Sequence, residues 1–296
     1  MELFELRGAQ DIHHNCIVKA YPNGRIESLV SQYAIFRESG WQLADDRSPK
    51  HYDWRDRLYP DELEELEYAE LERAAMRGDI GAADSSIARA RRRARSAVRE
   101  LAHANEFDMF VTFTLDSANV NRYDVAAVTK KLNVWLDNRV RRHGLRYVLV
   151  PELHKDGAVH FHGLVNSSAL APVDSGTLSG GGKPRRPRGA KHRAQLLAEG
   201  YHVVYNLPAW TLGFSTGIYL YGEYDAAVNY VTKYISKTDK KVGGRWYYSG
   251  GALKRPQVLY VDLDFDAFCA EHADGTWCSS DGLRFCSAVI DKGVIM

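Results

Sequence analysis

The feature that most constrains the fold is a strand–turn–strand pattern at residues 145–165. The runs LRYVLVPEL and AVHFHGLV are rich in residues that favour strands, and HKDG between them supplies a turn. Successive side chains of a strand point to opposite faces. His160 and His162 would therefore aim two imidazoles at one face, while Phe161 would enter the core behind them. The pattern predicts an antiparallel hairpin that presents half of a metal site.

The length of the turn decides which residue faces these two histidines. A two-residue turn would place Leu153 opposite His160, whereas a three-residue loop with its glycine in the left-handed bulge position would place Glu152 there. The apolar pattern favours the second register because it buries Leu153. We therefore expect Glu152, His160 and His162 to converge, with His154 nearby.

Two histidines and one carboxylate with open coordination positions suit Mg²⁺ or Mn²⁺ acting on a phosphate, and they could also hold zinc. For Glu152 alone, a cross-strand salt bridge is the ordinary alternative. For His154, a surface position beside the turn is favoured over a role as a metal ligand. The sequence therefore predicts a divalent-metal site at Glu152, His160 and His162.

The surrounding elements predict an α+β fold with a mainly antiparallel sheet. MFVTFTLD (109–116) alternates strictly between apolar and polar residues and is typical of a half-buried strand. Further strands are expected at 201–207, 214–220 and, at an edge, 244–251, and helices at 61–77, 85–104, 122–144 and 223–237. A small hairpin is expected around Asn23-Gly24. Residues 171–193, rich in Gly, Pro, Ser and Arg, are expected to form a mobile basic loop.

These elements predict three regions. They are an N-terminal accessory region with two helices (1–104), a catalytic domain (105–255) and a C-terminal tail without an assigned role (256–296). A zinc site in the tail, at Cys269, His272, Cys278 and Cys286, is disfavoured because the spacing matches no common zinc pattern.

The composition restricts the class of protein. No apolar run reaches the roughly 18 residues of a membrane span. The start, MELFELRGAQ, lacks the pattern of a signal peptide, and four cysteines are too few for a disulfide framework in a chain of 296 residues. We therefore expect a cytoplasmic protein that does not enter a membrane.

A second constellation lies in YVTKYISK (230–237). Tyr230 and Tyr234 are four residues apart and would share a helix face, and each is followed three residues later by a lysine, Lys233 or Lys237. A phenolate can attack a phosphodiester, and a nearby lysine favours the phenolate over the neutral phenol, whose ordinary pKa is about 10. The alternative is a half-buried helix face with lysines that extend to solvent.

The net charge of +1 conceals two basic segments, RARRRARSAVR (89–99) and KPRRPRGAKHR (183–193). Either segment could be an ordinary solvated surface. The candidates for contacts with DNA phosphates are Arg92, Arg95, Arg185, Arg186, Arg188 and Lys191. The nearby SGGGKP is not a phosphate loop, so neither a nucleotide cofactor nor a motor domain is expected.

Three motifs, in this order, resemble those of the HUH endonucleases, in particular the two-tyrosine rolling-circle replication initiators found in single-stranded DNA phages, prophages and plasmids. FVTFTLD is similar to the first motif strand, HFHGL to the His-hydrophobic-His motif and YVTKYISK to the two-tyrosine motif. Together they cover roughly residues 107–250. The resemblance implies a five-stranded, mainly antiparallel sheet flanked by helices, with a helical N-terminal extension and Mg²⁺ or Mn²⁺ as cofactor.

The resemblance also implies the reaction and the residues that carry it. The protein would nick one strand of single-stranded or extruded origin DNA and become linked to its 5′ phosphate, while a host helicase and polymerase extend the free 3′ hydroxyl. Carried over, the metal ligands are His160, His162 and Glu152, the nucleophiles Tyr230 and Tyr234, the supporting cations Lys233 and Lys237, and the residues lining the site Thr112, Thr114 and Asp116.

Three alternatives stay open. A transposase or mobilisation relaxase would use the same chemistry. A non-catalytic DNA-binding regulator would keep the fold without the reaction. A metal hydrolase would attack with metal-bound water and leave no link between protein and DNA.

Overall fold

The computed structural model describes residues 12–38, 80–154, 156–180, 183–222, 224–237, 240–278 and 282–290. They fall into two compact units, one within Glu64–Lys254 and the other within Met1–Leu63 together with Arg255–Met296. The helix expected at residues 61–77 lies outside the described residues. None of the helices in these ranges is long and apolar enough to cross a membrane.

A seven-stranded antiparallel sheet forms the centre of the larger unit. Its strands run in the order β11-β6-β7-β5-β10-β9-β8. In chain order they are β5 (Met109–Leu115), β6 (Tyr147–Leu153), β7 (Val159–Val165), β8 (Val173–Ser179), β9 (His202–Asn206), β10 (Gly213–Tyr219) and β11 (Tyr248–Gly250).

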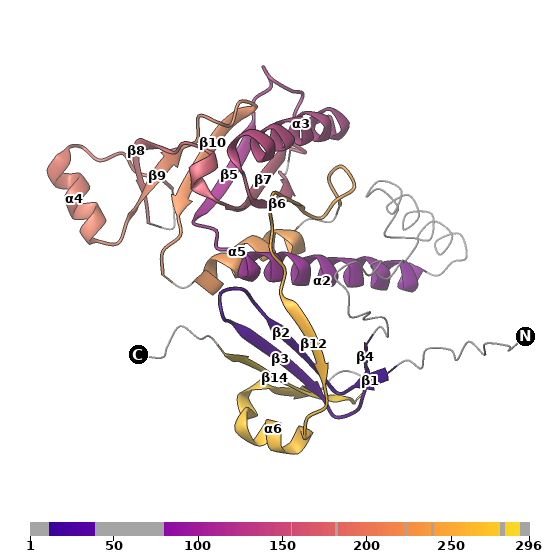
Figure 1. Cartoon of the computed structure of the whole chain (residues 1–296). Coiled ribbons are helices and arrows are strands. Elements are labelled where there is room, and N and C mark those ends of the chain that lie inside the picture. The colour runs from indigo at the N-terminus through magenta and orange to yellow at the C-terminus, as the bar shows by residue number, and fades with distance from the viewer. Residues whose placement is uncertain are drawn as a thin grey trace, which may run out of the picture. The chain divides into compact units, whose positions relative to one another are not determined.

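Helices cover both faces of this sheet (Figure 1). Helix α3 (Val125–His143) begins at the cap Asp124 and ends at Gly144, whose φ of 65° suits a glycine. On its side of the sheet, Trp135 packs edge-on against the strand residue Phe113. Helices α2 (Ile80–Ala104) and α5 (Tyr224–Lys237) bury their apolar side chains with Leu164 of β7 on the other side.

The alternation within each strand therefore feeds two cores. Phe113 and Phe161 belong to the core under α3. Their neighbours in sequence point to the α5 face, because adjacent strand residues alternate. That face is thus the one on which the predicted site residues lie.

Most expected elements are confirmed to within a few residues: the strand at 109–116 is β5, the helix at 122–144 is α3, the helix at 223–237 is α5 and the edge strand at 244–251 is β11. The expected number of five strands is wrong, because β8 and β9 extend the sheet beyond β10.

The single long loop expected at residues 171–193 is also wrong. The segment contains the strand β8 and leads into helix α4 (Ala190–Ala198). Pairing with β9 turns a weakly strand-forming sequence into a strand, at the cost of a register shift between Asp174 and Thr177. Gly176, with φ of 74°, accommodates that irregularity.

The smaller unit is a five-stranded sheet in the order β12-β2-β3-β14-β13, together with α6 (Phe265–Glu271) and the short pair β1 (Ile12–His14) and β4 (Phe36–Glu38). The strands are β2 (Cys16–Ala20), β3 (Ile26–Ser31), β12 (Gln257–Val261), β13 (Thr276–Cys278) and β14 (Arg284–Ile290). The expected hairpin around Asn23-Gly24 is confirmed as β2–β3.

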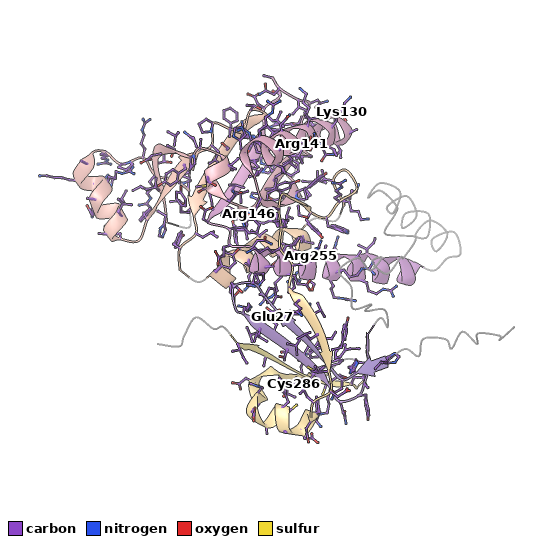
Figure 2. The ribbon with its side chains drawn as sticks, in the orientation of Figure 1. Glu27, Lys130, Arg141, Arg146, Arg255 and Cys286 are labelled. Atoms are coloured by element: carbon purple, nitrogen blue, oxygen red, sulfur yellow. The ribbon has the colours of Figure 1, made fainter. Side chains whose placement is uncertain are left out.

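The core of this smaller unit contains two cysteines from opposite ends of the chain. Cys16 and Cys286, the second of which Figure 2 labels, are fully buried with Val30 and Phe265. All four cysteines are free thiols. Burial raises the pKa of the Cys16 thiol to about 11, as expected for a cysteine that serves packing.

Candidate metal and tyrosine site

The β6–β7 hairpin closes with the longer of the two loops considered from the sequence. Glu152 lies opposite His160, and the backbone amide of His154 donates to Ala158 O at 2.8 Å. Gly157 has φ of 86°, the left-handed conformation expected at the bulge position. The predicted register is therefore confirmed, and it brings Glu152 onto the face of the two histidines.

Strand β5 lies directly beside β7 and supports both imidazoles. Thr112 pairs with His162 in register, and Thr114 with His160. Thr112 Oγ1 lies 3.0 Å from His162 Nδ1, and Thr114 Oγ1 lies 3.3 Å from His160 Nδ1. Each ring thus has its Nδ1 side engaged by a hydroxyl of the neighbouring strand.

The other nitrogen of His162 contacts the carboxylate across the hairpin. His162 Nε2 and Glu152 Oε2 are 2.8 Å apart, and their side chains are 11% and 27% exposed. His160 has its pKa lowered by burial and by the neighbouring His154, whose ring centre is 5.4 Å away. His154 itself is largely exposed at the turn, 3.4 Å from Asp156.

Helix α5 brings both tyrosines to the same place. The ring of Tyr234 stacks on His162, with centres 4.0 Å apart and planes 12° apart. Tyr234 Oη donates to Tyr230 Oη at 2.8 Å, and Tyr230 packs edge-on against Phe110. Tyr230 is 50% exposed, whereas Tyr234 is 6% exposed. Burial, followed by its hydrogen bond to Tyr230, raises the pKa of Tyr234.

The remaining predicted site residues differ in how closely they approach. Lys233 is exposed on α5, and Lys237 is the last residue of that helix. Asp116 follows β5, and its carboxylate accepts a hydrogen bond from Ala118 N at 3.0 Å. That bond stabilises the turn after the strand, so Asp116 has a local structural role here.

The donors suit a divalent cation in type, because two imidazoles and one carboxylate share a face. Among the described residues, however, no three His, Cys, Asp or Glu side chains are grouped as a site that could hold a metal ion. Glu152 and His162 instead bond to each other. A cation at these three residues would replace that hydrogen bond.

The predicted DNA-contacting residues are exposed in two places of the same unit. Arg92 and Arg95 lie on α2. Arg185, Arg186 and Arg188 precede α4, and Lys191 lies in its first turn. Arg185 also covers the ring of Tyr201 at 5.5 Å.

One exposed aromatic residue near the site had not been predicted. Phe214 on β10 lies opposite Thr114, so the two side chains share the face that carries His160. Phe214 is 70% exposed. The alternation of residues 214–218 contains this information, but it needs the knowledge that β10 pairs with β5. Trp210, in contrast, is buried and stacks on Phe113.

Comparison with known proteins gives one match. Residues 108–239 match the family model of the replication-associated proteins of the ORF2 type. Neither a curated protein nor a solved structure matches the chain. The matched region begins at β5, includes HFHGL and both tyrosines of α5, and ends just after that helix. This region is therefore similar to the replication-associated proteins of that family, which is consistent with a rolling-circle replication initiator.

Proposed function

We propose that this chain nicks one strand of DNA at a specific site and so initiates rolling-circle replication. One observation carries the proposal: a tyrosine pair from α5 meets the histidine pair from β7, with Tyr234 stacked on His162. The two motifs are about 70 residues apart in the chain, and a core helix has no general need to place two phenols against two imidazoles. The match to the replication-associated family supports the same conclusion.

In the proposed reaction, a tyrosine oxygen attacks the phosphorus of a DNA phosphodiester. The phosphorus–O3′ bond breaks, the 5′ phosphate becomes ester-linked to the tyrosine, and the departing O3′ takes a proton to become a free hydroxyl. Glu152, His160 and His162 would hold Mg²⁺ or Mn²⁺. When bound, the cation supplies Lewis-acid polarisation of the non-bridging oxygens.

The two tyrosines are placed for different tasks. Tyr230 is half exposed, so DNA can reach its oxygen, and the hydrogen bond from Tyr234 stabilises negative charge on that oxygen. Lys233, on the same helix, adds positive charge. The buried Tyr234 would attack in a second step, after Tyr230 is occupied.

The partners in this proposal are single-stranded or extruded origin DNA and a host helicase and polymerase. Unpaired DNA is required because both tyrosine and metal must reach one phosphate. The exposed basic segment before α4 supplies phosphate contacts, so replacing Arg185, Arg186 and Arg188 with glutamine is expected to lower the salt dependence of binding. Each lost contact lowers the slope of log affinity against log salt by about 0.7 for single strands. The same change at Arg142 on α3 is the matched control.

The test is a covalent-trapping assay with Mn²⁺ and labelled single-stranded DNA that carries the element's own origin, read on a denaturing gel. The expected result is a protein–DNA adduct that is lost in the Tyr230→Phe/Tyr234→Phe double variant and in His160→Ala. Tyr219→Phe is the matched control, because Tyr219 is 40% exposed and pairs with Met109 on the opposite face of the sheet.

Other outcomes point to other functions. Cleavage without an adduct would indicate a metal hydrolase. DNA binding with neither cleavage nor adduct, on a panel that tiles the whole element, would indicate a non-catalytic regulator. A transposase or relaxase would form the same adduct, but its substrate would be a transposon end or a transfer origin.

A further inference from the structure

The two threonines of β5 that face the site form a matched set with the two histidines. Each threonine lies directly opposite one histidine in the β5–β7 register, Thr112 opposite His162 and Thr114 opposite His160. Each hydroxyl reaches the same ring atom, Nδ1, at 3.0 and 3.3 Å. A repeated contact to one nitrogen of two rings is more specific than general polarity of the face.

The nitrogen that is engaged determines the nitrogen that is left to bind. A histidine that binds a cation through Nε2 carries its proton on Nδ1 and donates it to a supporting group. A hydroxyl can accept that proton, and it can also donate to an unprotonated Nδ1. A threonine can therefore hold His162 both while Nε2 bonds to Glu152 and after Nε2 binds a cation.

We propose that Thr112 and Thr114 are positioning residues, which hold the Nδ1 sides of His162 and His160 so that both Nε2 atoms are directed toward a divalent cation. This inference rests on the metal site of the proposed function. It assigns a task to the alternating strand 109–115, whose polar face has no other use in the reaction.

Threonine suits this task in two further ways. Its branched Cβ leaves few side-chain rotamers on a strand, so the hydroxyl is held in place without further bonds. A hydroxyl is also neutral, whereas a carboxylate in the same place would increase the proton affinity of the ring. The support therefore fixes the rings without adding charge at the cation site.

The test replaces each threonine with valine in the full chain, alone and together. Valine keeps the shape and the strand preference and removes only the hydroxyl. Thr216→Val is the matched control, because Thr216 lies opposite Thr112 on the far side from β7, on the same face, and is exposed. Thr112→Ser and Thr114→Ser restore the hydroxyl.

The measurement is Mn²⁺ affinity without DNA, from the amount of free Mn²⁺ seen by electron paramagnetic resonance. Loss of such a supporting partner typically weakens metal binding about 10- to 100-fold. We expect that loss for Thr112→Val and Thr114→Val, near-original affinity for the serine variants, and no change for Thr216→Val. Long-range proton–nitrogen spectra should also show that His160 carries its proton on Nδ1, and that Thr114→Val alters its ring signals.

The possible failures can be told apart. Wild-type affinity in both valine variants would overturn this proposal and leave the metal site of the proposed function intact. An equal loss in Thr216→Val would show a general effect on the face and would also overturn it. If the wild-type chain binds no Mn²⁺, both the metal site and the role of the threonines fail, whereas tyrosine attack would still be judged by the covalent adduct.

Discussion

Replacing the two tyrosines with phenylalanine one at a time separates their roles. Tyr230→Phe removes the hydroxyl that is half exposed, so we expect it to abolish the first covalent adduct with DNA. Tyr234→Phe keeps the ring that stacks on His162 but removes the hydroxyl that donates to Tyr230. The first adduct should therefore still form in Tyr234→Phe, but more slowly.

The size of the slowing follows from the hydrogen bond of 2.8 Å between the two phenols. A hydrogen bond to a charged group contributes about 1.5–3 kcal/mol, and about 1.36 kcal/mol of barrier changes a rate tenfold. If the bond stabilises the oxygen of Tyr230 as it attacks, Tyr234→Phe slows the first nick by about 10- to 150-fold.

The assay is adduct formation in a single turnover, with Mn²⁺ and labelled single-stranded origin DNA. Digestion of the adduct and mass spectrometry then identify the tyrosine that carries the nucleotide, and Tyr219→Phe should react at the wild-type rate. Two results would refute the reasoning: DNA attached first to Tyr234 in the wild-type chain, or an unchanged rate in Tyr234→Phe.

Three further changes test other features. Phe214→Ala should weaken single-stranded DNA binding by about 1–3 kcal/mol through lost base stacking; fluorescence anisotropy measures this, and Val134→Ala on α3 should have no effect. Tyr224 has its pKa raised to about 12 by burial, so the stability that its neutral hydroxyl gives is complete below pH 10 and is lost as pH rises through 12; Tyr224→Phe should flatten this loss in denaturant titrations. Gly163→Ala places a Cβ against the backbone of Val148 in β6 and should lower the free energy of unfolding by about 1–3 kcal/mol.

Each of these predictions has an outcome that opposes it. Equal DNA affinity after Phe214→Ala would remove Phe214 from the binding surface. An unchanged alkaline profile in Tyr224→Phe would mean that other groups, such as Tyr147, whose pKa burial also raises to about 12, cause the loss. Wild-type stability of Gly163→Ala would mean that β6 adjusts freely.

The hairpin could be predicted in detail because its information is local. The turn length, the left-handed glycine and the apolar alternation together identify Glu152 as the residue opposite His160. The tyrosine helix was equally readable, since a spacing of four residues fixes a shared face. The contact between Tyr234 and His162 joins these two local patterns and is the part of the site that the sequence could only suggest.

What escaped prediction depends on which strands become neighbours. The bonds from Thr112 and Thr114 require β5 beside β7, and the position of Phe214 requires β10 beside β5. Strand β8 was missed because it gains its hydrogen bonds only from a partner about 30 residues later. The tail was unreadable for the same reason, since β12 and β14 find their partners near the other end of the chain.

That pairing of distant segments has a consequence for synthesis. The β2–β3 hairpin leaves the ribosome early, but its neighbours β12 and β14 follow more than two hundred residues later. At bacterial and eukaryotic rates of elongation, both outer edges of the hairpin wait roughly 10 to 45 seconds for their partners. During that time they are open to wrong pairing with other chains. A chain cut short before residue 257 would keep those edges permanently, so the smaller unit makes completion of the polypeptide a condition for its own folding.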